Sequence, residues 1–164
     1  MKPVTYTLLN SIGRKTAQEI AEIYLENNLG HTDLHRLSRM SGKGTRIFVA
    51  KQNDHILGFG CLNFVRQPTS TTAEIFDILL HPAMGMPWEP EKCPHPHWTE
   101  LYREIIKAMN ETIDSSKNLG EIRLIDSEIK AGQVERHKIL RKLSFRHEGG
   151  RFFTIQSKHY QFKD

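Results

Sequence analysis

One amphipathic helix pattern between two strand patterns sets the main limit on how this chain folds. Apolar residues recur over four turns between residues 98 and 113, at the spacing of one helix face. This stripe consists of Trp98, Leu101, Tyr102, Ile105, Ile106, Met109 and Ile113. The strand pattern before it, residues 72–80, ends in Ile78-Leu79-Leu80, a run typical of burial on both faces. The pattern after it covers residues 121–125. We therefore expect a helix whose apolar stripe packs on a sheet.

The remaining periodic segments extend this unit to the order βααβββαβαββ. The expected strands are residues 4–9, 46–51, 55–65, 72–80, 121–125, 145–148 and 151–158. The expected helices are residues 16–29, 32–40, 98–113 and 134–143. Thr16 and Glu19 have the spacing of a capping box, while Asn53-Asp54 and Gly149-Gly150 are turn signals between strands. This order predicts one α/β domain over residues 1–164, with a mixed, twisted sheet of about seven strands and helices on both faces.

Composition restricts the environment and the partners of the chain. No apolar run approaches the ~20 residues of a membrane helix, and residues 1–6 lack the apolar core of a signal peptide. The two cysteines are too few for a disulfide framework, so a reducing cytoplasm is expected. Net charge is +4, and the closest basic run, Arg136-His137-Lys138 with Arg141-Lys142, falls on a predicted helix. We interpret this run as a solvated helix face and expect neither a nucleic-acid nor a membrane partner.

Four segments resemble motifs of the GNAT superfamily of N-acetyltransferases, and they follow one another along the chain in the order that the family has. Residues 73–82 resemble its fourth strand, commonly written E-x-x-D-L-x-V-x-P, and residues 51–59 resemble its second and third strands. Residues 121–124 are similar to the fifth strand, and residues 139–145 resemble the signature F-Y-x-K-L-G-F. The resemblance covers essentially the whole chain. It implies a GNAT-like fold, acetyl-coenzyme A as cosubstrate and a primary amine as acceptor.

The resemblance also implies where the cosubstrate binds. In this family the fourth and fifth strands splay apart, and the pantetheine arm lies in the slot between them. The phosphates bind at the start of the third helix, where free N–H groups and the helix dipole attract an anion. The residues implied for these two parts of the site are Leu79, Leu80 and His81 on the strand, and His97, Trp98 and Thr99 on the helix.

The loop before that helix departs from the family pattern. The family has the type R/Q-x-x-G-x-G/A, whereas this chain reads Cys93-Pro94-His95-Pro96-His97, with prolines in place of both inner glycines. Proline lacks an N–H group, so each replacement removes one phosphate donor and predicts a degenerate pyrophosphate-binding loop. Proline is also favoured at the first helical position, so Pro96 is a suitable helix start.

Two carboxylates of the fourth strand, Glu74 and Asp77, are the candidates for the base that takes the ammonium proton. They are three residues apart on a strand, which predicts that they point to opposite faces and that only one faces the acceptor. The tyrosine of the signature is often the acid in this family, but Leu140 occupies its position. The candidates that remain for the acid are His137, Tyr102, Tyr160 and water.

The sequence thus predicts direct acetyl transfer within a ternary complex, without a metal, and leaves the acceptor open. Two alternatives remain. Loss of the glycines and of the tyrosine favours a catalytically degenerate GNAT-like binding or regulatory module. Cys93, His95 and His97 alternate along an extended segment and offer ligands for a metal ion such as zinc. The final hairpin is a possible contact in a homodimer.

Overall fold

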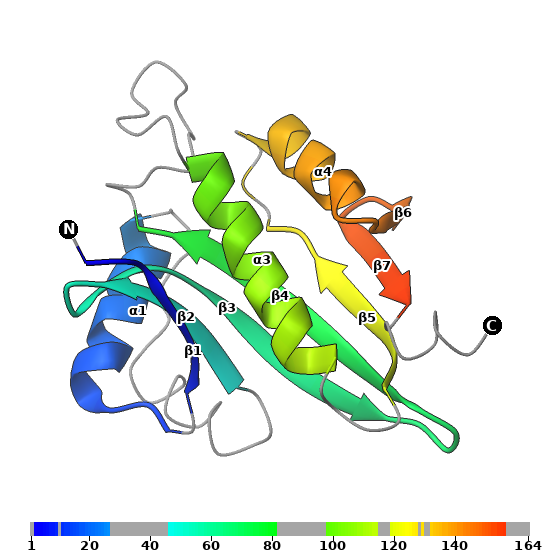
Figure 1. The fold of residues 1–164 in the computed structure, drawn as a ribbon, viewed down its shortest axis with the longest axis horizontal. Helices are drawn as coiled ribbons and strands as arrows, with labels where there is room; N and C mark the ends of the chain where they lie inside the picture. Colours follow the sequence, from blue (N-terminus) through cyan, green and yellow to red (C-terminus); the bar gives the residue numbers. More distant parts are fainter. Residues whose placement is uncertain are drawn as a thin grey trace.

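The computed structural model describes residues 2–9, 11–26, 46–81, 98–114, 119–127, 129 and 132–156. These residues form a seven-stranded mixed sheet with the order β1-β2-β3-β4-β5-β7-β6 (Figure 1). The strands are β1 (Thr5–Leu9), β2 (Arg46–Gln52), β3 (His55–Arg66), β4 (Thr71–Leu80), β5 (Leu119–Ile125), β6 (Arg146–Gly149) and β7 (Phe152–Gln156). The helices are α1 (Arg14–Glu26), α3 (Trp98–Asp114) and α4 (Gln133–Lys142). The predicted fold class is confirmed, whereas the predicted helix over residues 32–40 lies outside the described residues.

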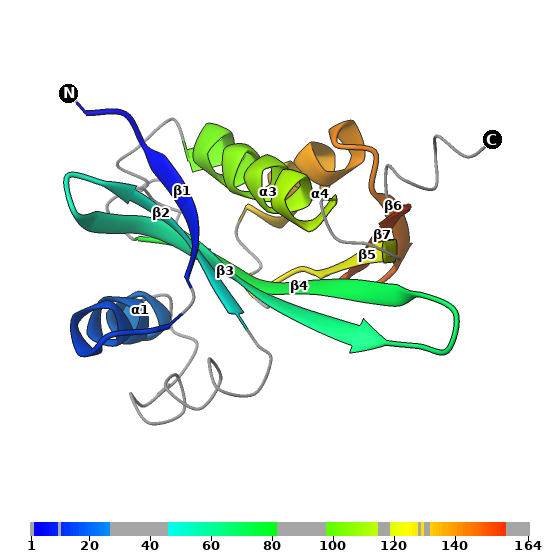
Figure 2. The ribbon, with the colours of Figure 1, turned by 60° about the horizontal axis from the view of Figure 1, so that its bottom comes forward.

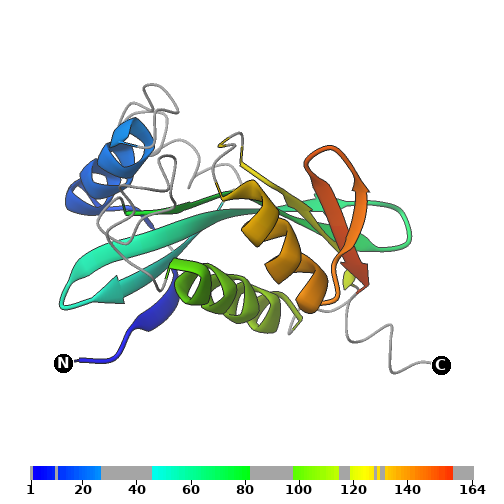
Figure 3. The same cartoon turned by 90° about the horizontal axis from the view of Figure 1, so that it is seen from above.

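Helices cover both faces of the sheet, as predicted. Helix α1 packs on one face, and α3 and α4 pack on the other (Figures 2 and 3). All seven residues of the predicted apolar stripe of α3 are buried. Gly58 and Gly60 of β3 lie beneath this helix, where an added Cβ would come within 2.9 Å of Ile105 Cδ1 and 2.8 Å of Met109 Sδ, respectively. The two glycines therefore let α3 approach the sheet closely.

The two predicted hairpins are confirmed. Asn53 and Asp54 join β2 to β3 with φ angles of 52° and 64°, the positive values that a type I′ turn requires at both central positions. Gly149 and Gly150 join β6 to β7, also with positive φ. Strand β4 pairs with β5 in parallel, whereas the other neighbouring pairs in the sheet are antiparallel.

Helix α1 begins two residues earlier than predicted. The N–H of Ala17 already donates to the carbonyl of Gly13 at 3.0 Å, so Thr16 lies inside the first turn and the predicted capping box is wrong. Glu19 has another role, because its Oε2 accepts a hydrogen bond from the backbone N–H of Ile56 at 3.1 Å. This bond ties α1 to the start of β3. Within the described residues, none of the helices has the length and apolarity that crossing a bilayer requires.

Candidate active site

The pairing between β4 and β5 ends halfway along β4. Their parallel pairing runs from Thr71 and Leu119 to Ile75 and Leu124, whereas β4 stays paired with β3 as far as Leu80. The second half of β4 therefore runs on beyond its pairing with β5. In Figure 1 the end of β4 runs toward α1, while the chain after β5 turns toward α4. This divergence is the splay that the family resemblance implies.

A β-bulge lies at the point of divergence. Phe59 pairs with Leu79 and Cys61 pairs with Phe76, so two residues of β4, Asp77 and Ile78, lie opposite one residue of β3. Asp77 has a φ of 49°, in the left-handed region that aspartate enters more readily than most residues. Bulges bend their strand and re-aim a side chain. The bulge thus accounts for both the turn of β4 away from β5 and the direction of the Asp77 carboxylate.

The Asp77 carboxylate is held by a tyrosine of α1. The hydroxyl of Tyr24 donates to Asp77 Oδ2 at 2.8 Å and lies 3.7 Å from the sulfur of the buried Cys61. Burial raises the pKa of the Tyr24 phenol far above its usual range, and the nearby Cys61 and Asp77 groups raise it further. The phenol therefore stays protonated and acts as a donor to the carboxylate.

Glu74 and Asp77 do not point to opposite faces. An added Cβ on Gly60 would face α3, and Leu62, two residues further along β3, shares that face. Ile75 pairs with Leu62 and so also faces α3, which turns its neighbour Glu74 toward the α1 face. Asp77 bonds to α1 as well. The prediction is wrong because the bulge adds one residue to β4 and shifts the alternation of its side chains.

A buried charged cluster lies where the chain leaves β5. Arg136 of α4 donates from Nε to Asp126 Oδ1 at 2.8 Å and from Nη2 to Oδ2 at 3.2 Å, and both side chains are at most 1% exposed. Arg136 Nη2 also donates to the carbonyl of Ile129. The interpretation of this part of α4 as a solvated face is therefore wrong at Arg136. The carboxylate that neutralises Arg136 belongs to Asp126, which follows β5. The sequence of α4 alone therefore contains no sign that Arg136 is buried.

His137 shares the Asp126 carboxylate but faces away from β4. Its Nε2 lies 3.0 Å from Asp126 Oδ2, and its ring centroid lies 4.8 Å from that of Phe153 and 5.3 Å from that of His147. These contacts place the ring over β7, on the side of β5 opposite to β4. Leu140, at the position of the family tyrosine, is fully buried and has no proton to donate.

Of the two tyrosines that are alternative candidates for the acid, the structure describes Tyr102. Tyr102 of α3 is buried, and this burial raises the pKa of its phenol well above the usual range. The negative charge of Asp126 raises this pKa further, whereas the positive charge of Arg136 opposes the shift. Tyr102 thus lies close to the buried ion pair as a protonated phenol. Tyr160 lies outside the described residues.

The residues expected to bind the cosubstrate are described in part. His81 N–H donates to the carbonyl of Leu57 on β3 at 2.7 Å, and since backbone groups alternate along a strand, those of Leu80 face the splay. Leu79 and Leu80 are fully buried. Trp98 and Thr99 open α3, whose first N–H groups have no partner within the helix.

The predicted metal ligands Cys93, His95 and His97, with the proline-rich loop that carries them, lie outside the described residues. Among the described residues, no group of three or more histidine, cysteine or acidic side chains has the arrangement of a metal site. The structure does describe one acidic residue, Glu100, in the first turn of α3. An acidic side chain in this turn stabilises the helix itself through the helix dipole.

Sequence reasoning missed Tyr24, Asp126 and Arg136. Tyr24 belongs to the apolar stripe of α1 and was indistinguishable there from a core residue. The weak apolar pattern of α4 was a signal that some of its polar residues are buried, but it did not identify Arg136. Asp126, directly after an expected strand, stands at a position where functional carboxylates are common in α/β sheets.

Comparison with known proteins supports the fold through structure and not through sequence. No protein-family model matches the chain, and no curated protein matches it in sequence. A protein from Desulfovibrio desulfuricans assigned to the GNAT family of acetyltransferases matches its structure with a TM-score of 0.65, over 94% of this chain and 99% of that one, at 11% identity. The chain has the GNAT fold.

Other solved GNAT structures agree. The ribosomal-protein-S18-alanine N-acetyltransferase of Escherichia coli matches with a TM-score of 0.65 over 93% of this chain and 94% of its own, at 12% identity. Aminoglycoside 6′-acetyltransferase type Ii matches with a TM-score of 0.69 over 93% and 96% of the two chains, at 9% identity. At such low identity the likeness establishes the fold alone.

Proposed function

We propose that this chain is an N-acetyltransferase, which moves an acetyl group from acetyl-coenzyme A to a primary amine by direct attack in a ternary complex. The observation that carries the proposal is the position of Asp77. The bulge holds this residue where β4 and β5 diverge, and it sets the direction of the carboxylate. Acetyltransferases among the proteins of the same fold support this reaction class.

The residues that would hold acetyl-coenzyme A lie along one path. The backbone of Leu80 faces the splay, where pantetheine would lie, whereas the backbone of Leu79 faces β3 and would act only through the position of the strand. The first turn of α3, at Trp98 and Thr99, offers N–H groups to the phosphates. The divergence of the strands fits a narrow arm, whereas the prolines at positions 94 and 96 have no N–H group to donate to the phosphates. We therefore expect binding to be weaker than the fold alone implies.

Catalysis would proceed by one displacement, with two protons leaving the nitrogen. Asp77, or Glu74 on the same face, accepts the first proton from the ammonium group of the acceptor. The freed nitrogen attacks the carbonyl carbon of the thioester, the new C–N bond forms, and the C–S bond breaks with its electron pair going to sulfur. The nitrogen, now protonated in the product, releases its second proton to water and becomes the neutral amide. Since an ordinary thiol has a pKa of about 8.5, the sulfur leaves readily and takes its proton from water. No side-chain acid is then required, which agrees with leucine at position 140.

Release of free thiol from acetyl-coenzyme A, measured with a panel of primary amines, tests this function. Asp77→Asn keeps a residue that tolerates the left-handed φ but removes the base, and we expect it to lower kcat by about 100-fold with little change in affinity for acetyl-coenzyme A. Glu74→Gln is made in parallel, and Glu111→Gln, an exposed carboxylate on α3, is the matched control. Equal activity of Asp77→Asn, Glu74→Gln and the control would show that neither strand carboxylate is the base.

A second candidate is a binding or regulatory module that keeps the fold without the chemistry. It is favoured by the fully buried Leu140 at the position of the family's acid. Isothermal titration with acetyl-coenzyme A separates the two. Binding with turnover of at least one amine identifies the enzyme, binding without turnover over the whole panel identifies the module, and absence of binding contradicts the acetyltransferase.

A further inference from the structure

A cavity lies at the other end of the sheet, away from the splay. It has a volume of about 370 Å³ and opens beside the last turn of α3, at Ile113, and the first residue of β4, Thr71. Leu80 is nine positions after Thr71 on β4, which corresponds to roughly 30 Å along a strand. The volume lies within the range of about 300–1,000 Å³ that is usual for small-molecule sites. This cavity is therefore separate from the candidate active site and large enough for a ligand.

Strand alternation places two arginines and a phenylalanine on the face of the sheet that lines the cavity. Leu62, Phe64 and Arg66 follow one another at alternate positions of β3 and so share the face toward α3. Arg46 of β2 pairs directly with Leu62 and lies on the same face. Arg66 is four residues from Leu62, roughly 13 Å along the strand. The two arginines thus stand on one face of the sheet, with the partly exposed Phe64 on the strand between them.

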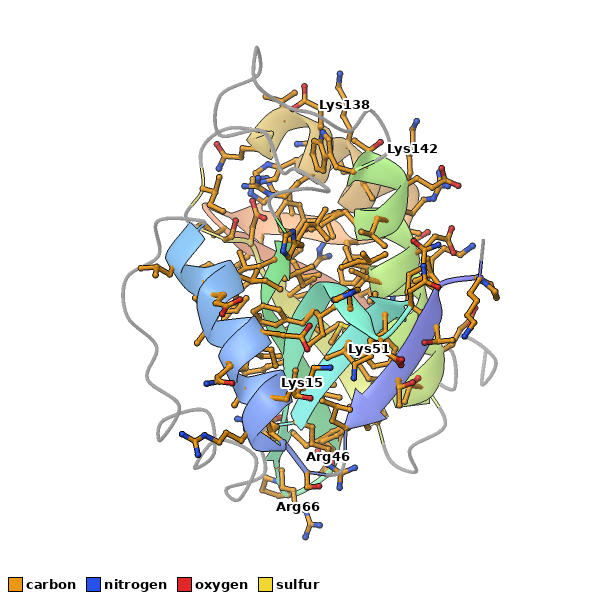
Figure 4. The ribbon with its side chains drawn as sticks, turned by 90° about the vertical axis from the view of Figure 1, so that its left-hand side faces the viewer. Lys15, Arg46, Lys51, Arg66, Lys138 and Lys142 are labelled. Atoms are coloured by element: carbon orange, nitrogen blue, oxygen red, sulfur yellow. The ribbon has the colours of Figure 1, made fainter. Side chains whose placement is uncertain are left out.

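Neither arginine is neutralised by the part of the chain that the structure describes. Both are exposed, and within the described residues neither forms an ion pair. Figure 4 shows Arg46 and Arg66 at the same end of the molecule. Two guanidinium groups without an ion pair in the described part of the chain therefore line this cavity, beside the partly exposed side chains of Leu8 and Phe64.

We propose that this cavity binds a small amphipathic carboxylate, with its carboxylate held between Arg46 and Arg66 and its apolar body against the partly exposed Leu8 and Phe64. Guanidinium groups match the geometry of a carboxylate and form charge-assisted hydrogen bonds with it. The hydroxyl of Thr71 adds a polar group at the same face. The site is independent of acetyl transfer, because it shares no residue with the splay.

The test uses two carboxylates, 4-phenylbutyrate and octanoate, and the neutral analogue 4-phenylbutanol, titrated into the intact protein by isothermal calorimetry and by NMR. We expect saturable binding of at least one carboxylate, with the largest NMR shifts at Leu8 and Phe64, and weaker binding of the alcohol. Arg46→Gln and Arg66→Gln should each lower affinity about tenfold, the effect of losing one charged hydrogen bond. Arg66→Glu should abolish binding.

Lys51→Gln and Lys138→Gln, which remove exposed or partly exposed cations away from the cavity, are the matched controls and should leave the affinity unchanged. Absence of saturable binding for both carboxylates overturns the proposal. Equal losses in the arginine variants and the controls also overturn it, since the effect would then be one of net charge. If the arginine variants had a lower Tm but an unchanged affinity, the arginines would stabilise the end of α3 and would not form a ligand site.

Discussion

Breaking the buried pair between Arg136 and Asp126 is expected to destabilise the domain strongly. Arg136→Met keeps a long apolar side chain in the space but leaves the carboxylate of Asp126, only 1% exposed, without its main partner. The carbonyl of Ile129 loses a donor as well. Removing one partner of a buried pair costs about 3–5 kcal/mol. For a domain of this size that corresponds to a fall in Tm of roughly 6–20 °C.

A double-mutant cycle with Asp126→Asn isolates the pair, because each single variant leaves one buried charge alone. All four proteins are made with His137→Gln, so that no imidazolium replaces the lost guanidinium at Asp126 Oδ2. Urea unfolding gives the free energies. The double variant should be more stable than Arg136→Met alone, since it no longer buries an uncompensated carboxylate.

The exposed pair of Arg146 and Glu148 supplies the control for this cycle. Arg146→Met should leave the urea midpoint almost unchanged, because solvent screens exposed charges. A loss below about 1 kcal/mol for Arg136→Met, or a double variant whose loss equals the sum of the single losses, would refute the argument that the two charges depend on each other.

Three further substitutions probe β4 and its neighbours. Tyr24→Phe removes the donor to Asp77 and should cost about 1 kcal/mol in urea unfolding, with kcat lowered more than KM changes; unchanged kcat would separate Tyr24 from the reaction. Asp77→Gly should cost about 1 kcal/mol or less, since glycine accepts the φ of 49° and so offsets part of the lost hydrogen bond from Tyr24, yet it should be inactive in thiol release; retained activity would contradict a role for this carboxylate. Gly60→Ala should lower Tm, because its Cβ would lie 2.8 Å from Met109 Sδ, with a cost of about 1–3 kcal/mol; an unchanged Tm would show that Met109 moves aside.

Much of the fold was predictable because its signals are local. The stripe of α3 and the turns at Asn53-Asp54 and Gly149-Gly150 specify their own conformations through residue spacing and positive φ. The start of α1 was placed two residues late because capping depends on the backbone that precedes a helix. Here the carbonyl of Gly13 accepts the first helical hydrogen bond. Thr16 has the sequence spacing of a cap residue but lies inside the helix.

The site was less predictable because its key features are produced by pairs of distant segments. Which residue of β4 becomes the bulge depends on its register with β3, and nothing within residues 71–80 alone fixes that register. Burial of Arg136 likewise depends on Asp126, ten residues earlier on another element. A charged residue on a helix is normally solvated, so only the paired carboxylate reverses the expectation.

The bulge in β4 determines where the Asp77 carboxylate lies, and so links the fold to the proposed chemistry. A regular β4 would continue its alternation, and with Glu74 on the α1 face, position 77 would then face α3. The extra residue turns Asp77 to the α1 face, where Tyr24 holds it, and it does so where the pairing with β5 ends. The side chains beyond it resume alternation with Ile78 and Leu80 facing α3, so the core under that helix is kept. One inserted residue can thus place a carboxylate at the opening of the splay while the apolar packing of β4 remains intact.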